Sequence, residues 1–285
     1  MRRRGYLGAL AGAASLLAGC SGRQPPASDA TETVTPVPVP AAESVQSVTD
    51  SGVDPAAAGD AHVGALAGGS ATIGIEYVVR VDGEALDSIR ILSTIEDGAH
   101  TYRRFDVVRL QPAPQARVFR GVWHEDGETV LRFFEEGSQL VYQEPSDFTP
   151  APAAERFDRR RLVAALAAFD PAATPTTDGY RLAADAVARP ERLPTVEGVT
   201  GGTEGRLSAR RDADGTVPEL SATFGATADG DPASVTYRVA VADRGSTSVE
   251  RPDAAETLEW YHQLQENSPI ELVASTDDGD ADEAG

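Results

Sequence analysis

The sequence TIGIEYVVRVDGEALDSIRILSTIEDG spans residues 72–98 and contains two runs that resemble neighbouring strands. Large apolar side chains alternate with polar or small ones in most of the first run, which is the period-two pattern of a half-buried strand. Each run ends in an Asp-Gly pair, Asp82-Gly83 and Asp97-Gly98. Because such pairs form the tight turns of antiparallel hairpins, the stretch predicts the start of an antiparallel meander.

The same pattern recurs along most of the chain, in two groups of strands on either side of a helical segment. Further strands are expected at 100–110, 117–125, 128–135, 138–143, 179–188, 204–211, 217–226 and 234–242, with a short one near 246–250. This order predicts an α+β fold, in which a strongly curved, half-barrel-like antiparallel sheet packs against a few short helices.

Three short helices are expected, at 54–67, 157–169 and 254–265. Asp54 can cap the first helix, and Pro55 suits its first helical position. Asp253 and Glu256 form a pair typical of a capping box at the start of the last helix.

Two features of these helices lead to separate expectations. Arg159, Arg160 and Arg161 begin the central helix, where positive charge is unfavourable, so they are expected to pair with nearby carboxylates. His62 falls in the first helix and is expected at the protein surface.

The strands at 117–125 and 128–135 are apolar on both faces. Both faces are therefore expected to be covered, one by helices and the other by a second layer or a cavity. Two interpretations remain open, a cavity for an apolar ligand and an ordinary two-sided core. The candidate cavity-lining residues are Phe119, Trp123, Leu131 and Phe133.

The N-terminus has the features of an export signal. A basic start precedes a short apolar run and small residues, which is typical of a signal peptide over residues 1–19. Its last residues resemble the lipobox of bacterial and archaeal lipoproteins, and Arg3 and Arg4 with the following residues resemble the twin-arginine export motif. The lipobox residues are Leu17, Ala18, Gly19 and Cys20.

The lipobox resemblance implies a lipid on Cys20, which becomes the new N-terminus, and a protein on the outer face of the cytoplasmic membrane. Cys20 is the single cysteine of the chain, and lipidation would account for an unpaired thiol in an exported protein. Residues 20–53 are rich in Ser, Thr and Pro and are expected to form a disordered tether. A single globular domain at 54–273 and a disordered acidic tail at 274–285 are expected to follow.

The composition is strongly acidic. The formal net charge is −20, and all 25 basic side chains are Arg. The three Arg of the leader contribute +3, so the mature chain would carry about −23. Acidity without Lys resembles a haloarchaeal proteome, in which molar salt screens the self-repulsion. A cation-binding surface is the alternative reading, and a nucleic-acid partner is excluded because it requires a basic patch.

The chain also resembles a haloarchaeal lipoprotein family of unknown function, through its lipobox, its tether, the entry Ala65–Ser70 to the first long strand, the Asp214–Val217 hairpin and Val249–Asp253. Its order of elements is similar to that of lipoprotein carriers of the LolA and LppX type. That similarity implies a curved sheet wrapped around helices, an apolar cavity and binding of acyl chains without catalysis.

Motifs of catalysis are missing from the sequence. The four His have no second His or Cys at ligand spacing, so neither a metal site nor a cofactor is expected. There is no Gly-x-Ser-x-Gly, phosphate loop or calcium loop. Glu125, Asp126 and Glu128 cluster near a turn, and they are the one carboxylate group that a hydrolase interpretation could use.

We therefore expect a non-enzymatic, lipid-anchored extracytoplasmic protein that binds an apolar small molecule or lipid in a curved-sheet cavity. The alternative is a protein-binding accessory subunit of a cell-envelope or transporter assembly, whose partner the sequence does not name. That alternative predicts an exposed aromatic patch, with Trp260 and Tyr261 as candidates.

Overall fold

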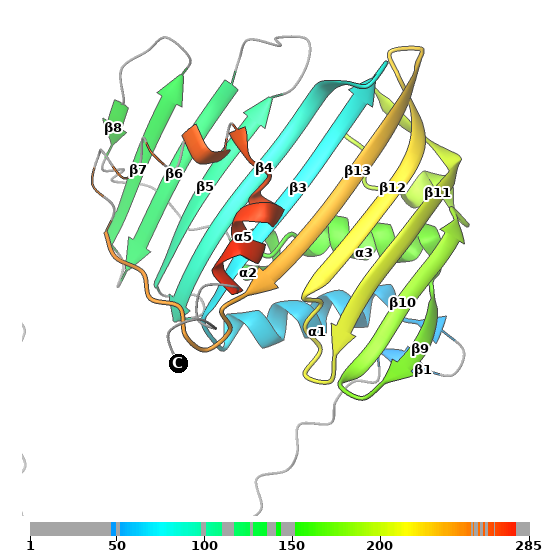
Figure 1. Ribbon diagram of the computed structural model, residues 1–285, viewed down its shortest axis with the longest axis horizontal. Helices are drawn as coiled ribbons and strands as arrows, with labels where there is room; N and C mark the ends of the chain where they lie inside the picture. The colour runs from blue at the N-terminus through cyan, green and yellow to red at the C-terminus, as the bar shows by residue number, and fades with distance from the viewer. Residues whose placement is uncertain are drawn as a thin grey trace, which may run out of the picture. The chain divides into compact units, whose positions relative to one another are not determined.

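An open antiparallel sheet of eleven strands forms the centre of the part of the chain that the structure describes (Figure 1). The structure is a computed structural model, and it describes residues 47–49, 52–97, 101–109, 117–125, 128–135, 141–143, 152–251, 253, 256, 259, 262–264 and 266–277. The sheet consists of β3 (Ala71–Val81), β4 (Glu84–Asp97), β5 (Thr101–Arg109), β6 (Arg117–Glu125), β7 (Glu128–Glu135), β8 (Val141–Gln143), β9 (Ala172–Thr176), β10 (Gly179–Ala186), β11 (Val199–Asp212), β12 (Glu219–Ala228) and β13 (Asp231–Ala242).

Two meanders make up this sheet. The first runs from β3 to β8 and the second from β9 to β13, and their inner ends meet where β13 pairs with β3. A separate two-stranded sheet pairs β1 (Val48–Thr49) with β2 (Gly52–Val53). The predicted α+β fold, with a large curved antiparallel sheet and few short helices, is confirmed.

The helices lie on both faces of the sheet. They are α1 (Pro55–Ala67), α2 (Ala153–Arg156), α3 (Arg159–Phe169), the short 3-10 helix η1 (Pro190–Arg192) and α5 (Pro269–Asp277). In Figure 1, α1 and α3 lie behind the sheet and α5 lies in front of it. We call the face that α1 and α3 cover the inner face, and the face that α5 covers the outer face.

Strand β3 is buried on both faces because of these helices. All nine residues from Ala71 to Val79 are buried, whereas the sequence pattern predicts a strand with one exposed face. On the inner face Ile73, Ile75 and Tyr77 join the main apolar core with α1 and α3. On the outer face α5 contacts β3, β4 and β13, so the small residue Gly74 lies directly beneath it.

The sequence signals for the helices are largely confirmed. The Asp54 carboxylate accepts hydrogen bonds from the backbone N–H groups of Ala56 and Ala57, at 3.0 and 3.1 Å. The Asp253 carboxylate accepts one from the N–H of Glu256 at 2.8 Å. The described residues of the expected third helix, at 256, 259 and 262–264, are helical.

The arginines of α3 pair with carboxylates as expected. Arg159 contacts Asp60 of α1 at 2.6 Å, and Arg161 contacts Asp158 at 2.9 Å. The helix begins at Arg159 rather than at residue 157, because Asp158 adopts a left-handed backbone with φ 52°.

Several elements differ from the sequence predictions. Strands β1 and β2 lie within residues 20–53, where a disordered tether is expected, and α2 and η1 were not predicted. Strand β9 was not predicted, since Ala-Ala-Thr-Pro-Thr has little apolar content and a Pro that only an edge strand tolerates. Residues 246–250 form no strand, because the N–H of Thr247 bonds to Ser70 Oγ and that of Val249 bonds to Glu96 Oε2. Helix α5 was not predicted either, and its last residues fall where the acidic tail is expected.

We predict that Gly74→Ala lowers the free energy of unfolding by about 1–3 kcal/mol, the usual cost of overpacking a core. A Cβ at this position would lie 2.5 Å from the carbonyl oxygen of Pro269 and 3.0 Å from Val273 Cγ2, so α5 would have to shift. The matched control is Gly69→Ala, whose Cβ would have no heavy atom within 4 Å. Thermal and denaturant unfolding of both variants in molar salt measures the difference, and equal stability of the two would contradict the proposed packing of α5.

Candidate binding site

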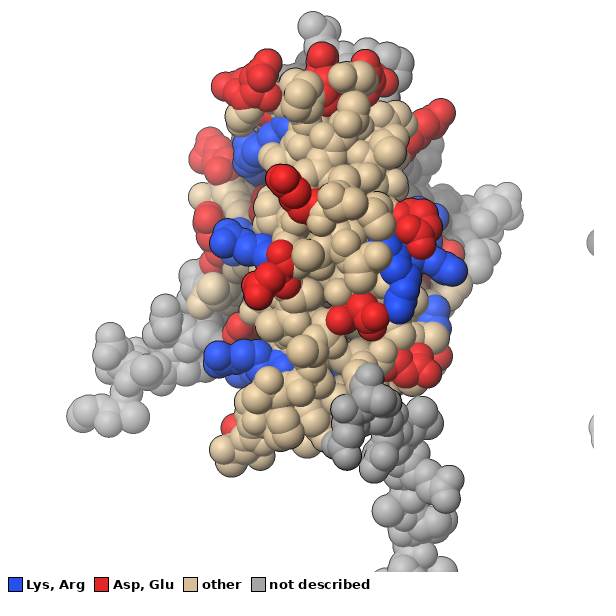
Figure 2. Space-filling model, turned by 90° about the vertical axis from the view of Figure 1, so that its right-hand side faces the viewer, with Lys and Arg blue, Asp and Glu red and all other residues tan. Residues whose placement is uncertain are grey.

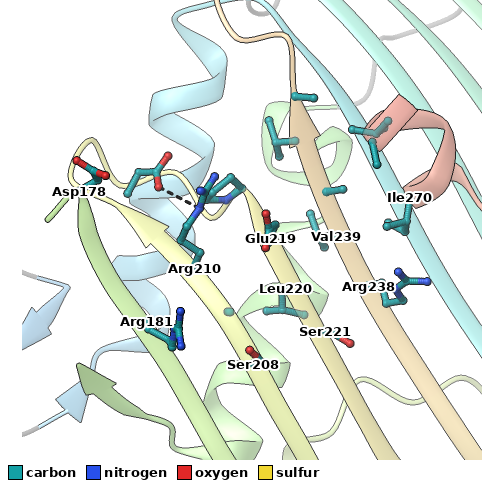
Figure 3. Close-up of a pocket in the computed structure, with 18 of the residues that line it drawn as sticks. Asp178, Arg181, Ser208, Arg210, Glu219, Leu220, Ser221, Arg238, Val239 and Ile270 are labelled. Atoms are coloured by element: carbon teal, nitrogen blue, oxygen red, sulfur yellow. Dashed lines mark ion pairs between the residues drawn. The ribbon is translucent and has the colours of Figure 1, made fainter. Parts of the chain in front are cut away.

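A groove of about 600 Å³ runs along the outer face, between α5 and the bare part of the sheet (Figure 3). It exists because α5 covers only the centre of the sheet, over β3, β4 and β13. The outer surfaces of β10, β11 and β12 are left uncovered beside the helix, and the step between helix and strands forms the groove. Its lining residues come from these strands, from the turn before β10 and from α5.

The two walls of this groove differ in chemistry. Ile270, Val273 and Ala274 of α5 form an apolar wall, and Ala240 and Ala242 of β13 continue it onto the sheet. Three arginines from three strands also line the groove, and Figure 3 shows Arg181 and Arg210 on the side away from α5 and Arg238 beside Ile270 of α5. They are Arg181 of β10, Arg210 of β11 and Arg238 of β13.

The strand register explains why these arginines lie together. Arg181 pairs with Arg210 across β10 and β11, and Arg210 pairs with Glu219 across β11 and β12. Directly paired residues of neighbouring strands lie on the same face. The like charges of Arg181 and Arg210 therefore lie side by side, an arrangement that repels and that an anion between them would relieve.

Nearby carboxylates neutralise only part of the positive charge of these three arginines. Arg210 Nε lies 3.5 Å from Asp212 Oδ1, and Arg238 lies 3.7 Å from Glu76. Asp212 is shared with Arg244, which contacts it at 2.7 Å. Arg181 forms no ion pair with any carboxylate among the described residues, and its side chain is exposed. The guanidinium groups remain accessible to a ligand in the groove.

The acidic surface charge is spread rather than gathered. Seen from the side of β9 and β10, acidic side chains are scattered over the face, and the basic ones lie mainly along its two flanks (Figure 2). Among the residues that the structure describes, no group of three His, Cys, Asp or Glu could hold a metal ion. The interpretation of the acidity as an adaptation to solvent stays a prediction.

A largely buried polar cluster lies on the inner face. Tyr77 and Tyr237 pair across β3 and β13, and each is fully buried. Asp158 lies beside Tyr237, and the Arg161 guanidinium lies 5.7 Å from the centre of the Tyr77 ring. Burial raises the pKa of Tyr77 to about 12, and it also raises the pKa values of Tyr237 and Asp158. Since Arg161 and Asp158 lie at the start of α3 and the two tyrosines lie on the sheet, this cluster attaches α3 to the sheet.

The expectation that His62 lies at the surface is wrong. Its side chain is only 1% exposed, and its Nδ1 accepts a hydrogen bond of 3.1 Å from the backbone N–H of Val217. This bond joins α1 to the end of the turn between β11 and β12, just before β12. Burial lowers the pKa of His62 to about 4, so the imidazole is neutral at neutral pH, as an acceptor must be.

The four candidate cavity-lining positions fall on two faces of the sheet. The register pairs Phe119 with Phe134 and Trp123 with Val130, whereas it pairs Leu131 with Val122 and Phe133 with Arg120. Val122 belongs to the inner core, and Trp123 packs against Val249 with the Arg251 guanidinium 5.4 Å from its ring centre. The side chains of Phe119, Leu131 and Phe133 lie outside the described part of the chain, so a cavity there stays a prediction.

The remaining candidates do not form a site. Glu125 is exposed and pairs in register with Glu128, while Asp126 lies outside the described residues. His124 packs beside the ring of Tyr102, with 5.4 Å between the ring centres, and His262 is exposed on a helical segment.

The residues of the predicted export signal and aromatic patch lie outside the described part of the chain. They are Arg3, Arg4, Leu17, Ala18, Gly19, Cys20, Trp260 and Tyr261. None of the helices in the described ranges is both long and apolar enough to span a membrane.

Comparisons with known proteins were made at three levels. No protein-family model matches the chain, and no curated protein matches it either. Among solved structures, the chain is similar to LprF from Mycobacterium bovis, at 12% identity over 70% of this chain and 96% of that one, with a TM-score of 0.35. A DUF1329 family protein from Desulfovibrio piger is similar at 11% identity over 72% and 97%, with a TM-score of 0.26. Membership of a haloarchaeal lipoprotein family stays a prediction.

We predict that His62 makes the protein less stable as the pH falls from 7 to 5. Its pKa is about 4 when folded and about 6.5 when unfolded, so between these values the unfolded chain binds a proton that the folded chain does not. The linkage amounts to about 2 kcal/mol over this range, and it levels off below pH 4. Unfolding free energies at pH 7, 6 and 5 measure it. The variant His62→Gln should lose this slope, and an unchanged slope in the variant would exclude His62 as its source.

Proposed function

We propose that the protein is a non-enzymatic, lipid-anchored extracytoplasmic binding protein whose outer groove holds an amphipathic anionic ligand. The groove with two unlike walls is the observation that supports this function. An apolar wall from α5 faces Arg181 and Arg210 across the groove, and Arg238 lies at the foot of the α5 wall (Figure 3). A lipid headgroup with the first part of its acyl chain has the same division into an anionic and an apolar part.

The arginines favour an oxyanion over other polar ligands. A guanidinium offers a planar fork of donors that matches carboxylate and phosphate, and it binds them with short charge-assisted hydrogen bonds. Molar salt would screen long-range attraction to within about 3 Å. Direct hydrogen bonds would therefore hold the ligand, and the apolar wall would add burial of its hydrocarbon at about 25 cal/mol per Å².

The arrangement of polar groups supports binding rather than catalysis. The acid and phenol groups whose pKa values burial raises, Asp158, Tyr77 and Tyr237, are buried in the inner core and do not line the groove. The groove residues are arginines, serines and carboxylates of the sheet surface, with no nucleophile next to a base among the residues that line it.

A lipid on Cys20 would place the groove near a source of such ligands. Residues 20–53 would connect this anchor to the domain and keep it at the outer face of the cytoplasmic membrane. The anchor and the groove together support a role as a carrier or receptor for an amphiphile from the membrane.

The test is to identify what the protein binds in its own cells. The full-length Cys20→Ser protein is purified in molar salt, extracted with organic solvent and analysed by mass spectrometry. We expect one anionic amphiphile in near-stoichiometric amount. The double variant Arg181→Glu/Arg210→Glu should lose it, because two donors become repelling carboxylates.

The control is Arg206→Glu, which changes an exposed arginine on the same face of β11 outside the groove. Retention of the amphiphile by the double variant would exclude the groove as its site. A protein that copurifies without any amphiphile, and that the double variant loses, would instead support the accessory-subunit alternative.

A further inference from the structure

A second concave site lies on the other side of the domain from α5, between α1 and the hairpin that joins β11 to β12. Its volume is about 610 Å³, within the usual range for small-molecule sites. We call it the α1 pocket, and its lining residues are Ala57, Asp60, Ala61, Gly64, Ala65, Arg211, Ala213 and Asp214.

The geometry of the hairpin leaves this space open. Gly215 has φ +97°, and a Cβ there would lie 2.8 Å from the Cβ of Ala61. The tip of the hairpin therefore touches α1 at one point, while His62 holds its far side through Val217. Beside this contact, α1 presents side chains no larger than alanine at Ala57, Ala61 and Ala65, so a cavity with an apolar wall remains.

Arg211 is the unusual residue of this pocket. Only 8% of it is exposed, and its Nε has no hydrogen-bond partner within the described chain. It forms no hydrogen bond and no ion pair with any described residue, although Asp214 and the Tyr180 hydroxyl attract it at longer range. Burial lowers its pKa, which expresses the cost of removing a charge from water without a counterion.

The two carboxylates of the pocket have other partners. Asp214 contacts Arg244 at 2.7 Å and accepts a hydrogen bond of 2.9 Å from the N–H of Thr216. Asp60 contacts Arg159 at 2.6 Å. Both carboxylates of the pocket therefore have an arginine in direct contact, although Arg244 is shared with Asp212, whereas Arg211 has no direct ion pair among the described residues.

Two partly buried arginines of the described chain face carboxylates, and the more deeply buried Arg156, 4% exposed, lies 4.6 Å from the centre of the Tyr102 ring. Arg104 lies 2.7 Å from Asp106, and Arg161 lies 2.9 Å from Asp158. The fold thus neutralises these guanidinium groups with its own acids, while it holds Arg211 against a cavity. An unpaired buried charge is costly and is typical of a site that a ligand completes.

We propose that the α1 pocket binds an oxyanion, a carboxylate or phosphate, through Arg211, with an attached apolar group against the alanine face of α1. The shared chemistry is an anionic head on a short hydrocarbon. Either a free organic anion or a lipid headgroup could supply it. This site is independent of the outer groove, since none of the residues that line one lines the other.

The test uses the full-length Cys20→Ser protein in molar sodium chloride, where chloride already competes for weak anion sites. Isothermal titration is carried out with three probes: inorganic phosphate, octanoate, and dihexanoyl phosphatidylglycerol below its micelle concentration. We expect at least one probe to bind, and Arg211→Gln to weaken that binding by roughly tenfold or more. Binding of octanoate or phosphate indicates a free anion, and binding of the phospholipid alone indicates a headgroup.

Further variants separate the effect of the Arg211 guanidinium from general effects of charge. Arg211→Lys retains the charge without the planar fork and should bind the probe between wild type and Arg211→Gln. Arg206→Gln, an exposed arginine on the same strand, and the groove variant Arg181→Glu/Arg210→Glu should both bind as wild type does. Arg211→Gln should melt no earlier than wild type without a probe, because it removes an unpaired buried charge.

The proposal is overturned if no probe binds the wild-type protein, or if Arg211→Gln binds as tightly as Arg206→Gln. Loss of probe binding in the groove variant alone would assign the anion to the outer groove, and would likewise overturn a site at Arg211. If the extraction experiment finds no amphiphile in the outer groove, the interpretation of these titrations does not change.

Discussion

The pairing of β3 with β13 is the interaction on which the rest of the structure depends. It runs from Ala233↔Val81 to Ala242↔Thr72 and joins the two meanders into one sheet. Strands at the centre of so wide a sheet are buried on both faces only if helices cover both. The inner layer of α1 and α3 and the outer helix α5 provide that cover, and Gly74 is small because α5 rests directly on it.

Covering this junction buries polar side chains, which lie together in one cluster. Tyr77 and Tyr237 face each other across the junction, and Asp158 and Arg161 at the start of α3 lie over them. Because α1 and α3 fill the inner face, neither the outer groove nor the α1 pocket lies between a helix and the centre of the sheet. Each of the two sites lies at the side of a helix. One lies next to α5 on the outer face, and the other lies next to α1.

Arginine distinguishes these two sites from the rest of the molecule. In a chain with a net charge of −20, carboxylates are abundant, and most half-buried arginines of the described chain have one nearby. The groove instead brings Arg181 and Arg210 side by side, and the α1 pocket buries Arg211 without a counterion. In an acidic protein, positive charge that is left uncompensated next to a concavity indicates an anionic ligand.

The sequence by itself determined the class of fold and many of its local signals. Period-two alternation and Asp-Gly turns predicted most strands, because side-chain direction in a strand depends only on residue number. Asp54 and Asp253 marked helix starts, because a cap is a contact within three residues. The tertiary structure alone decided the register that unites Arg181, Arg210 and Arg238, the burial of His62 and the isolation of Arg211. Each of these depends on contacts between segments far apart in the chain, such as α1 against the β11–β12 hairpin, and local residue patterns do not encode which distant surfaces meet.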